Sequence, residues 1–259
     1  MRDSVNKPVK RGRRTAGPLN WSLRLMIPVV RNLSRLTFKE KFEGREQIPL
    51  EGPALLVLNH ISVLDPLATA SFVWTAGRVP SFMIKDGVFK VPVVGKLMTK
   101  ARQISVSRGS SAAQASLDSA IETLRAGGVV AVYPEGTVTR DPDFWPMRAK
   151  TGIARIALAV PDVPVIPIAQ WGAHQSYDYH TKKLDLLPRK QSHIRALEPM
   201  DISQYHGRTD NETARALTDA MMRRIADEVG LMRQQQPPTE LYRPSGRAKT
   251  ADDDASDAV

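Results

Sequence analysis

The sequence predicts an α/β domain in which a largely parallel central sheet is flanked by helices. The first observation behind this prediction is that short apolar runs alternate with helix-like stretches along most of the chain. The second is that these runs are too apolar to alternate between a buried and an exposed face, as expected for strands that helices cover on both sides. Hydrophobic residues make up 42% of the 259 residues, which is enough for a packed core.

The expected strands and helices alternate in the order that this fold requires. The strands are expected at residues 54–59, 81–85, 103–106, 129–133, 163–169 and 193–199. The helices are expected at residues 66–76, 92–101, 110–126, 150–159 and 211–228. Open α/β sheets usually bind ligands at the carboxyl ends of their parallel strands, so polar residues directly after these strands are the first candidates for a functional site.

The region before the first strand is expected to dock on a membrane. Residues 1–17 contain six Lys or Arg and nothing to bury, so this basic tail should be disordered. Residues 18–42 follow as an amphipathic helical segment, in which Asn20 and three arginines form a narrow polar stripe on an otherwise apolar surface. Pro28 should kink this pattern or divide it into two short helices. The segment is typical of a helix in a bilayer interface, and the alternative is an ordinary helix packed on the domain.

The composition limits the possible partners and location. The formal net charge of +10 indicates an anionic partner, and with 6% aromatic residues and no nucleic-acid motif we expect no nucleic acid. An anionic lipid surface and phosphorylated small molecules remain. The absence of cysteine excludes disulfides and thiol chemistry. No apolar run reaches 18 residues, so we expect no spanning helix and a peripheral location on the cytoplasmic face of the membrane.

A histidine and an aspartate follow the first expected strand. In the stretch LLVLNHISVLDPL (residues 55–67), His60 stands at the strand end and Asp65 precedes Pro66. Because Pro66 disfavours helical geometry at Asp65, we expect Asp65 to be the N-cap of the next helix and Pro66 its first residue. The loop can then bring the carboxylate back to the imidazole. Such a pair can take a proton from an alcohol, although a surface histidine and an unrelated N-cap would give the same spacing.

Other strand ends carry polar groups, several of which are cationic. They are the basic residues Lys85, Arg108 and Arg140, and the turn formed by Glu135, Gly136 and Thr137. Cationic side chains that gather at one edge of a sheet are typical of a phosphate site. The alternative is that these are three solvated cations in a chain that has 37 basic residues.

Four blocks of sequence, in a fixed order over roughly residues 45–200, carry a family resemblance. They are Asn59, His60 and Asp65 (Asn-His-x4-Asp); Lys85, Phe89, Pro92, Gly95 and Arg108; the run YPEGTVTR at 133–140; and VPVIPIA at 163–169. Together they resemble the glycerolipid acyltransferases of the 1-acylglycerol-3-phosphate O-acyltransferase type. The chain departs from that pattern at Val138, because the family usually has an arginine directly after Glu-Gly-Thr.

The resemblance implies a glycerol-phosphate-acyltransferase-like fold. We expect the acyltransferase domain at residues 43–230 and, from its composition, a largely disordered extension at 231–259. It also implies that a fatty acyl group moves from acyl-CoA or acyl carrier protein to lysophosphatidic acid, giving phosphatidic acid in phospholipid biosynthesis. No further cofactor is implied. We expect no metal, since the sequence has no compact cluster of His and carboxylate ligands beyond His60 and Asp65.

In this interpretation His60 is the general base and Asp65 orients it. The resemblance assigns substrate binding to Asn59, Lys85, Arg108, Glu135, Gly136, Thr137 and Arg140. Two alternatives stay open. The acceptor is glycerol 3-phosphate or another lysolipid, or the same pair activates water and the protein is a lipid or thioester hydrolase.

Overall fold

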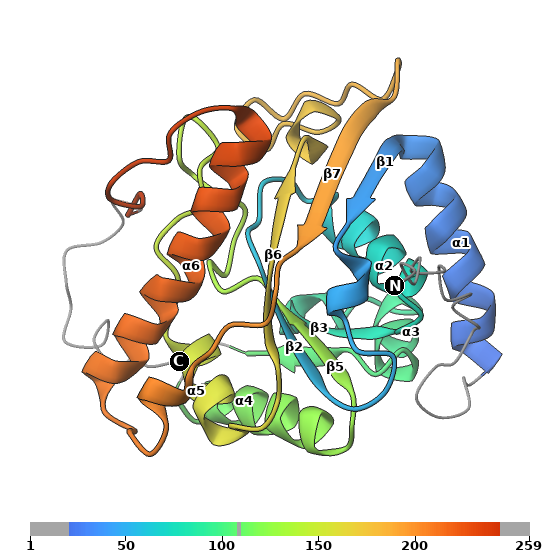
Figure 1. Cartoon of the computed structure of the whole chain (residues 1–259). Helices are drawn as coiled ribbons and strands as arrows, with labels where there is room; N and C mark the ends of the chain where they lie inside the picture. Colours follow the sequence, from blue (N-terminus) through green and yellow to red (C-terminus); the bar gives the residue numbers. More distant parts are fainter. Residues whose placement is uncertain (1–20, 108–109, 244–259) are drawn as a thin grey trace, which may run out of the picture.

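The structure is a computed structural model that describes residues 21–107 and 110–243, and it is built on one seven-stranded sheet (Figure 1). The strands are β1 (Phe38–Glu43), β2 (Ala54–Leu58), β3 (Pro80–Lys85), β4 (Ile104–Val106), β5 (Val129–Val132), β6 (Val165–Trp171) and β7 (Lys190–Ala196). Their order across the sheet is β1-β7-β6-β2-β5-β3-β4. All neighbours are parallel except β6 and β7, so the expected largely parallel sheet is confirmed.

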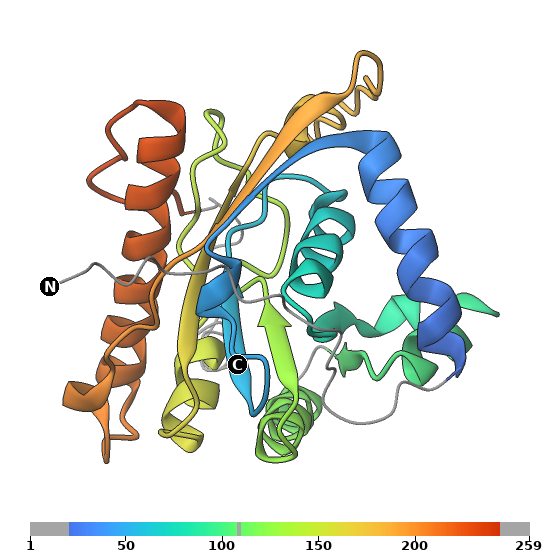
Figure 2. The ribbon, with the colours of Figure 1, turned by 45° about the vertical axis from the view of Figure 1, so that its right-hand side comes forward.

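Helices cover both faces of this sheet. They are α1 (Trp21–Thr37), α2 (Asp65–Thr75), α3 (Val94–Lys100), α4 (Ser110–Arg125), α5 (Gly152–Ala159) and α6 (Asn211–Arg233). The first three lie on one side of the sheet and the last three on the other (Figures 1 and 2). Successive side chains of a strand point to opposite faces, so Leu55 and Val57 join the core under α4–α6 whereas Leu56 and Leu58 join the core under α2. This arrangement explains why the central strands are apolar at every position.

The N-terminal segment differs from the expectation in two ways. The helix ends at Thr37, and residues 38–43 form an edge strand that pairs in parallel with β7 instead of continuing the helix to residue 42. Its sequence FKEKFE alternates as a half-exposed edge strand does. Pro28 lies inside α1 without dividing it into two helices. Packing of α1 on α2 therefore overrides the weak helix propensity of that position.

The observed bounds of β6 and β7 differ from the expected ones because of pairing with neighbouring strands. The last strand begins at Lys190, three residues before its expected start, because Lys190 is the partner of Phe38 in β1. Likewise β6 continues to Trp171, which is paired with His193 of β7. Pairing with a neighbouring strand thus sets the strand ends.

The described part of the C-terminal extension is packed on the domain. Helix α6 continues to Arg233, beyond the expected boundary at residue 230. After it, the carbonyl of Pro238 accepts a hydrogen bond of 2.7 Å from Arg223, and the carbonyl of Tyr242 accepts one of 3.0 Å from the backbone N–H of Arg148. The basic tail at 1–17 and the last residues, 244–259, lie outside the described residues.

A buried arginine forms hydrogen bonds with the loops at the amino ends of β2 and β5. Arg78 follows α2 and is only 2% exposed. Its guanidinium donates to the carbonyls of Pro49 and Gly52 at 2.6 Å each and to the carbonyl of Gly127 at 3.0 Å. These carbonyls belong to the loops that lead into β2 and β5. A guanidinium, with five donors in a planar fork, can satisfy several carbonyls at once.

We expect Arg78→Ala to lower the free energy of unfolding by about 2–4 kcal/mol, because it leaves three carbonyl acceptors and a cavity below the sheet. Urea denaturation measures this change. Arg125→Ala at the exposed end of α4 is the matched control, and its effect should stay within about 0.5 kcal/mol. Equal effects of the two substitutions would show that the Arg78 contacts contribute nothing to stability.

Candidate active site

Asn59 fixes the carboxyl end of β2 to the neighbouring strand β6. Its side chain donates to the carbonyl of Gln170 at 3.0 Å and accepts from the backbone N–H of Gln170 at 2.9 Å. The Gln170 side chain in turn donates to the carbonyl of Asn59. Asn59 is fully buried. Both polar atoms of the Asn59 side chain are thus bonded to Gln170, and the expected contact of Asn59 with substrate stays a prediction.

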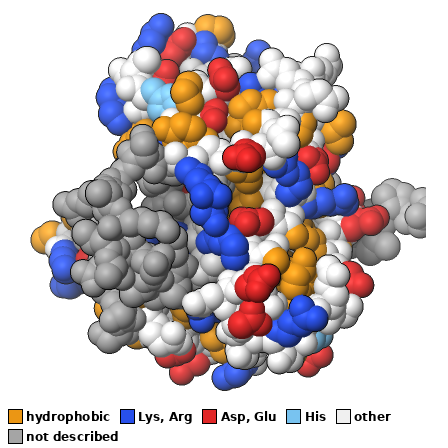
Figure 3. Space-filling view, turned by 90° about the vertical axis from the view of Figure 1, so that its left-hand side faces the viewer, with side chains coloured by type: hydrophobic (Ala, Val, Ile, Leu, Met, Phe, Trp, Pro, Cys, Tyr) orange, Lys and Arg blue, Asp and Glu red, His pale blue; other side chains and the backbone are white. Residues whose placement is uncertain are grey.

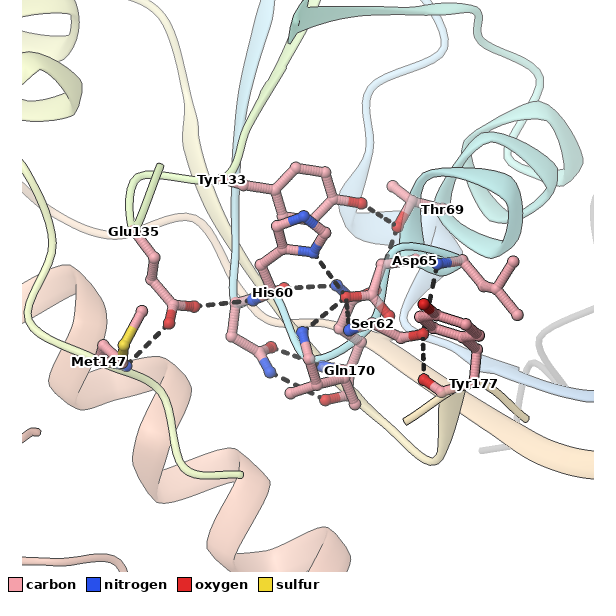
Figure 4. Close-up of polar contacts among 12 residues, drawn as sticks. His60, Ser62, Asp65, Thr69, Tyr133, Glu135, Met147, Gln170 and Tyr177 are labelled. Atoms are coloured by element: carbon pink, nitrogen blue, oxygen red, sulfur yellow. Dashed lines mark hydrogen bonds and ion pairs between the residues drawn. The ribbon is translucent and has the colours of Figure 1, made fainter. Parts of the chain in front are cut away.

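His60 and Asp65 form the hydrogen-bonded pair that the sequence predicts (Figure 4). The imidazole Nδ1 lies 2.8 Å from the Asp65 Oδ2. The aspartate is fully buried, whereas 15% of the His60 side chain remains exposed. With the Nδ1 proton directed to the carboxylate, Nε2 carries the free lone pair, and Nε2 has no hydrogen-bond partner among the described residues. The ring is thus oriented to accept a proton from a ligand.

The Asp65 carboxylate organises the turn between β2 and α2. The same Oδ2 accepts hydrogen bonds from the backbone N–H of Ile61 at 2.6 Å and of Ser62 at 2.8 Å. Asp65 is the first residue of α2, with Leu64 as N-cap, so the helix begins one residue earlier than expected. The expected N-cap role is wrong, because the carboxylate bonds the preceding loop and the imidazole rather than the amides of α2.

A stacked tyrosine supports the His60 ring from one side. The Tyr133 ring lies against His60 with centroids 4.4 Å apart and an interplanar angle of 24°. Its hydroxyl donates to Thr69 Oγ1 at 2.9 Å, and Thr69 donates to Gln170 Oε1 at 3.1 Å. This chain of bonds links β5, α2 and β6 behind the histidine (Figure 4). Desolvation around the hydroxyl raises the pKa of Tyr133, so it stays a neutral donor. Sequence reasoning missed Thr69 and Gln170, which bear no local signal of this role.

Glu135 connects the turn after β5 to the histidine from the opposite side. One carboxylate oxygen accepts from the backbone N–H of His60 at 2.7 Å, and the other accepts from that of Met147 at 2.9 Å. The residue is 6% exposed, and burial raises its pKa to about 8 although the two amide donors oppose the shift. Each oxygen accepts one backbone amide, so in this structure Glu135 holds the turn after β5 against the end of β2. The expected contact of Glu135 with substrate stays a prediction.

The rest of the Glu-Gly-Thr turn faces outward. Gly136 is exposed and has a φ of +71°, a left-handed conformation that favours glycine. Thr137 is half-buried, and Val138 is buried at 3% exposure. After it, the backbone N–H of Thr139 donates to the carbonyl of His60 at 2.7 Å. Gly136 and Thr137 therefore remain available to a ligand beside the histidine, whereas Val138 belongs to the core.

Two of the three cationic candidates lie in the described part of the chain, and both are exposed to solvent. Lys85 and Arg140 are exposed, and Arg108 lies outside the described residues. Lys150 is a further candidate that sequence reasoning missed. Its backbone N–H donates to the carbonyl of Pro134 at 2.9 Å, and its side chain runs over Gly136, since a Cβ on that glycine would lie 3.7 Å from Lys150 Cε. The aliphatic part of this side chain thus lies over the turn that follows β5.

A stack of rings holds the segment after this turn in place. Phe144 lies between the rings of His174 and His180, with centroids 4.5 Å away on each side. His180 Nε2 lies 2.9 Å from the carbonyl of Thr139. The stacked rings join the segment that follows β5 to the one that follows β6. Burial lowers the pKa of His174 to about 4, so this ring is neutral near pH 7.

Neither a metal cluster nor a membrane-spanning helix occurs in the part of the chain that the structure describes. Residues 21–107 and 110–243 contain no group of three or more His, Cys, Asp or Glu that could hold a metal ion. Within the same ranges, every helix is too short or too polar to cross a bilayer.

Glu135 should make the stability of the protein depend on pH. Its pKa is raised in the folded protein, so between about pH 4.5 and 8 the unfolded chain loses a proton that the folded protein keeps. Unfolding free energy should therefore fall as pH rises through this range, by up to about 1.4 kcal/mol per pH unit. Glu135→Gln cannot ionise at this position. The free energy of unfolding of the variant should therefore rise relative to that of wild type as the pH increases.

Urea denaturation at pH 5, 6, 7 and 8 measures this trend. The amide of Glu135→Gln opposes a backbone N–H, so this variant is less stable by an offset that does not depend on pH, and only the slope is diagnostic. Glu122→Gln on the exposed side of α4 is the matched control. Parallel pH profiles of wild type and Glu135→Gln would contradict a raised pKa.

Comparison with known proteins is consistent with this site. The family model described as Acyltransferase matches residues 39–171, which include His60, Asp65 and the turn after β5. The 1-acyl-sn-glycerol-3-phosphate acyltransferase BAT2, chloroplastic, of Brassica napus is 32% identical over 137 residues, covering 52% of this chain and 38% of the relative. The N-acylphosphatidylethanolamine synthase of Arabidopsis thaliana is 26% identical over 160 residues, covering 58% of this chain and 56% of the relative. The chain thus spans well under two thirds of these relatives.

A solved structure shares the fold. The crystal structure of the 1-acyl-sn-glycerophosphate (LPA) acyltransferase from Thermotoga maritima superposes with a TM-score of 0.59 at 23% sequence identity. The similarity covers 83% of each chain, and at this identity it supports the fold alone. Together with the family match over more than half of the sequence, the comparisons identify this chain as a member of the Acyltransferase family.

Proposed function

We propose that this acyltransferase transfers a fatty acyl group from an acyl thioester, acyl-CoA or acyl-acyl carrier protein, to the free hydroxyl of lysophosphatidic acid. The observation that carries this proposal is the His60–Asp65 pair, in which Nδ1 is bonded at 2.8 Å and Nε2 is free among the described residues. A neutral imidazole with a buried carboxylate behind it is the arrangement that a general base requires.

The reaction needs only this pair and the two substrates. Nε2 of His60 takes the proton of the acceptor hydroxyl as its oxygen attacks the thioester carbonyl. The C–O bond forms, the C–S bond breaks, and the departing thiolate receives the proton from the imidazolium. Asp65 stabilises the imidazolium while it exists and keeps Nδ1 protonated. No protein nucleophile is required, in agreement with the absence of cysteine from the sequence.

An apolar cavity next to the site supports an aliphatic substrate. It has a volume of about 240 Å³ and lies among α1, α2, β3 and α3. One of its walls is Phe82, whose ring is parallel to that of Tyr133 with centroids 6.2 Å apart, and Tyr133 in turn stacks on His60. The wall of the cavity at Phe82 is thus two stacked rings away from His60. We place the acyl chain in it.

The identity of the acceptor rests on chemistry and on relatives. The named acceptor of the Brassica napus relative is 1-acyl-sn-glycerol 3-phosphate, and this makes lysophosphatidic acid the first candidate. The Arabidopsis thaliana relative is named for a different acylated lipid, and Val138 removes the arginine that the family usually has. Glycerol 3-phosphate and other lysolipids are therefore competing acceptors.

The described part of the expected membrane segment has a surface that suits a lipid interface. On α1, the side chains of Leu25, Val29, Leu33 and Leu36 are between 51% and 71% exposed. The helix contains three arginines and no acidic residue. We propose that α1 docks peripherally on the inner face of the membrane, where a lysolipid acceptor and a phospholipid product both reside.

Incubation of the purified protein with labelled acyl-CoA and a panel of lysolipids, followed by identification of the product, tests the reaction. We expect His60→Ala to reduce transfer by about 10²–10⁴-fold while the protein stays folded, because general-base assistance is worth that much. Asp65→Asn should lose both activity and stability, since the buried oxygen accepts from two backbone amides as well as from the imidazole.

Two results of this assay would refute the proposal. Near wild-type turnover by folded His60→Ala protein would remove the histidine from the mechanism. Acyl release that is equally fast with and without any acceptor would identify a hydrolase instead. Tyr205 lies on a short 3-10 helix before α6, outside the network around His60, so Tyr205→Phe is the control for handling and expression.

The acceptor phosphate should be bound by cations among the candidates Lys85, Arg108, Arg140 and Lys150. Alanine substitution of Lys85, Arg108, Arg140 or Lys150 should raise the acceptor KM by about tenfold or more and leave the donor KM unchanged, because charge-assisted hydrogen bonds contribute about 1.5–3 kcal/mol. Lysine in place of Arg108 should also lose activity if that contact is bidentate. Steady-state kinetics with Arg125→Ala as control measures this, and unchanged kcat/KM in all four variants would contradict the assignment.

A further inference from the structure

The connection from β3 to α3 presents a group of apolar side chains to solvent. Val93 is 76% exposed, and its neighbours Val91, Val94 and Leu97 are between 36% and 47% exposed. This connection protrudes beside the lower end of α1 (Figure 2), and α3 is in contact with α1. Single exposed apolar residues are ordinary, but four within seven residues form a patch, and such patches usually mark an interaction surface.

The backbone holds this patch outward at an energetic cost. Val93 has φ of 69° and ψ of −54°, and the backbone N–H of Val94 donates to the carbonyl of Pro92 at 2.8 Å. This is a three-residue turn with positive φ, which is rare and strained, above all for a β-branched residue. Behind it Gly95 packs on the carbonyl of Phe89 so closely that a Cβ would collide. The strain brings no packing inside the monomer, because Val93 faces solvent.

The charges around the patch match an anionic surface. Residues 85–102 contain five Lys or Arg and one acidic residue, Asp86, which is paired with Lys90 at 3.0 Å. Helix α1 adds three arginines and contains no acidic residue, and one of them, Arg35, lies 3.8 Å from Glu40 of β1. By contrast, α6 on the opposite side has four basic and four acidic residues, and Figure 3 shows both signs intermixed on that face. The positive excess of these elements therefore lies on the α1 and α3 side.

We propose that residues 91–97 insert into an anionic bilayer as a second membrane contact, beside the exposed stripe of α1. The patch is on a protruding turn rather than in a groove, and a protruding apolar turn with cations around it suits a lipid surface better than a bound peptide. Met98 of α3 and Ile27 of α1 line the same apolar cavity, so the two contacts flank the pocket in which we place the acyl chain. In this respect the inference rests on the proposed function.

Flotation of the full-length protein with vesicles that contain phosphatidylglycerol tests the inference, with phosphatidylcholine vesicles as the uncharged comparison. The double variant Val91→Asp, Val93→Asp should bind the anionic vesicles about tenfold more weakly, since it removes two apolar anchors and adds two negative charges. Leu231→Asp is the matched control, because Leu231 is 70% exposed on α6, and it should bind like wild type.

A glycine variant separates membrane contact from folding. Val93→Gly relieves the positive φ, so its melting temperature should equal or exceed that of wild type, while its vesicle binding should still weaken several-fold. Leu33→Asp tests the α1 contact independently. The inference is overturned if the double variant binds like Leu231→Asp, if wild type ignores anionic vesicles, or if gel filtration shows a dimer that the double variant dissociates.

Kinetics distinguish this inference from the proposed function. With a short-chain acceptor that is monomeric in water, the double variant should transfer acyl groups at the wild-type rate, because residues 91–93 contact the bilayer and not the acceptor. A wild type that binds anionic vesicles through Val93 but transfers nothing would leave the membrane contact intact and reject the proposed reaction.

Discussion

One buried carboxylate determines the arrangement of the candidate site. Oδ2 of Asp65 accepts from the imidazole of His60 and from the backbone amides of Ile61 and Ser62. A carboxylate with no exposure to water requires such donors, and here they come from the turn that carries the histidine. Desolvation of Asp65, closure of the turn and orientation of His60 are therefore parts of the same interaction.

A second buried carboxyl group gives the site its other boundary. Glu135 bonds the backbone of His60 and of Met147, so the turn after β5 cannot move without the end of β2. The hydrogen bonds between Asn59 and Gln170 likewise hold the end of β2 to β6. Three adjacent strand ends are thus fixed to one another by side chains that the resemblance assigned to substrate. Among the described candidates, the residues that keep exposure to solvent are His60, Lys85, Gly136, Thr137 and Arg140.

The molecule has two unlike sides, and this suits a lipid substrate. Next to α1 and α3 are exposed valines and leucines, unbalanced basic charge and the apolar cavity. On α6 the charges of both signs are equal in number. A substrate with an anionic head and an aliphatic tail has partners for both parts on the first side, and a bilayer that contains this substrate has the same two properties.

The sequence by itself determined the parallel sheet, the six strands and five helices of its body, and the pairing of His60 with Asp65. Each of these depends on local signals: apolar runs, a proline after Asp65, and five residues that can form one turn. The edge strand β1 was missed, because its pairing with β7 joins residues about 150 positions apart and its own pattern is weak.

Only the tertiary structure decided which candidate residues face a ligand. Whether Glu135 meets a substrate or a backbone amide depends on where Met147 returns to the sheet, and Lys150 reaches Gly136 only because the intervening segment folds back. The role of Asn59 likewise depends on Gln170, which is distant in the chain and adjacent in the sheet. The order of the strands places these groups together. The contacts that set this order join residues far apart in the chain, so local sequence patterns cannot predict the strand order.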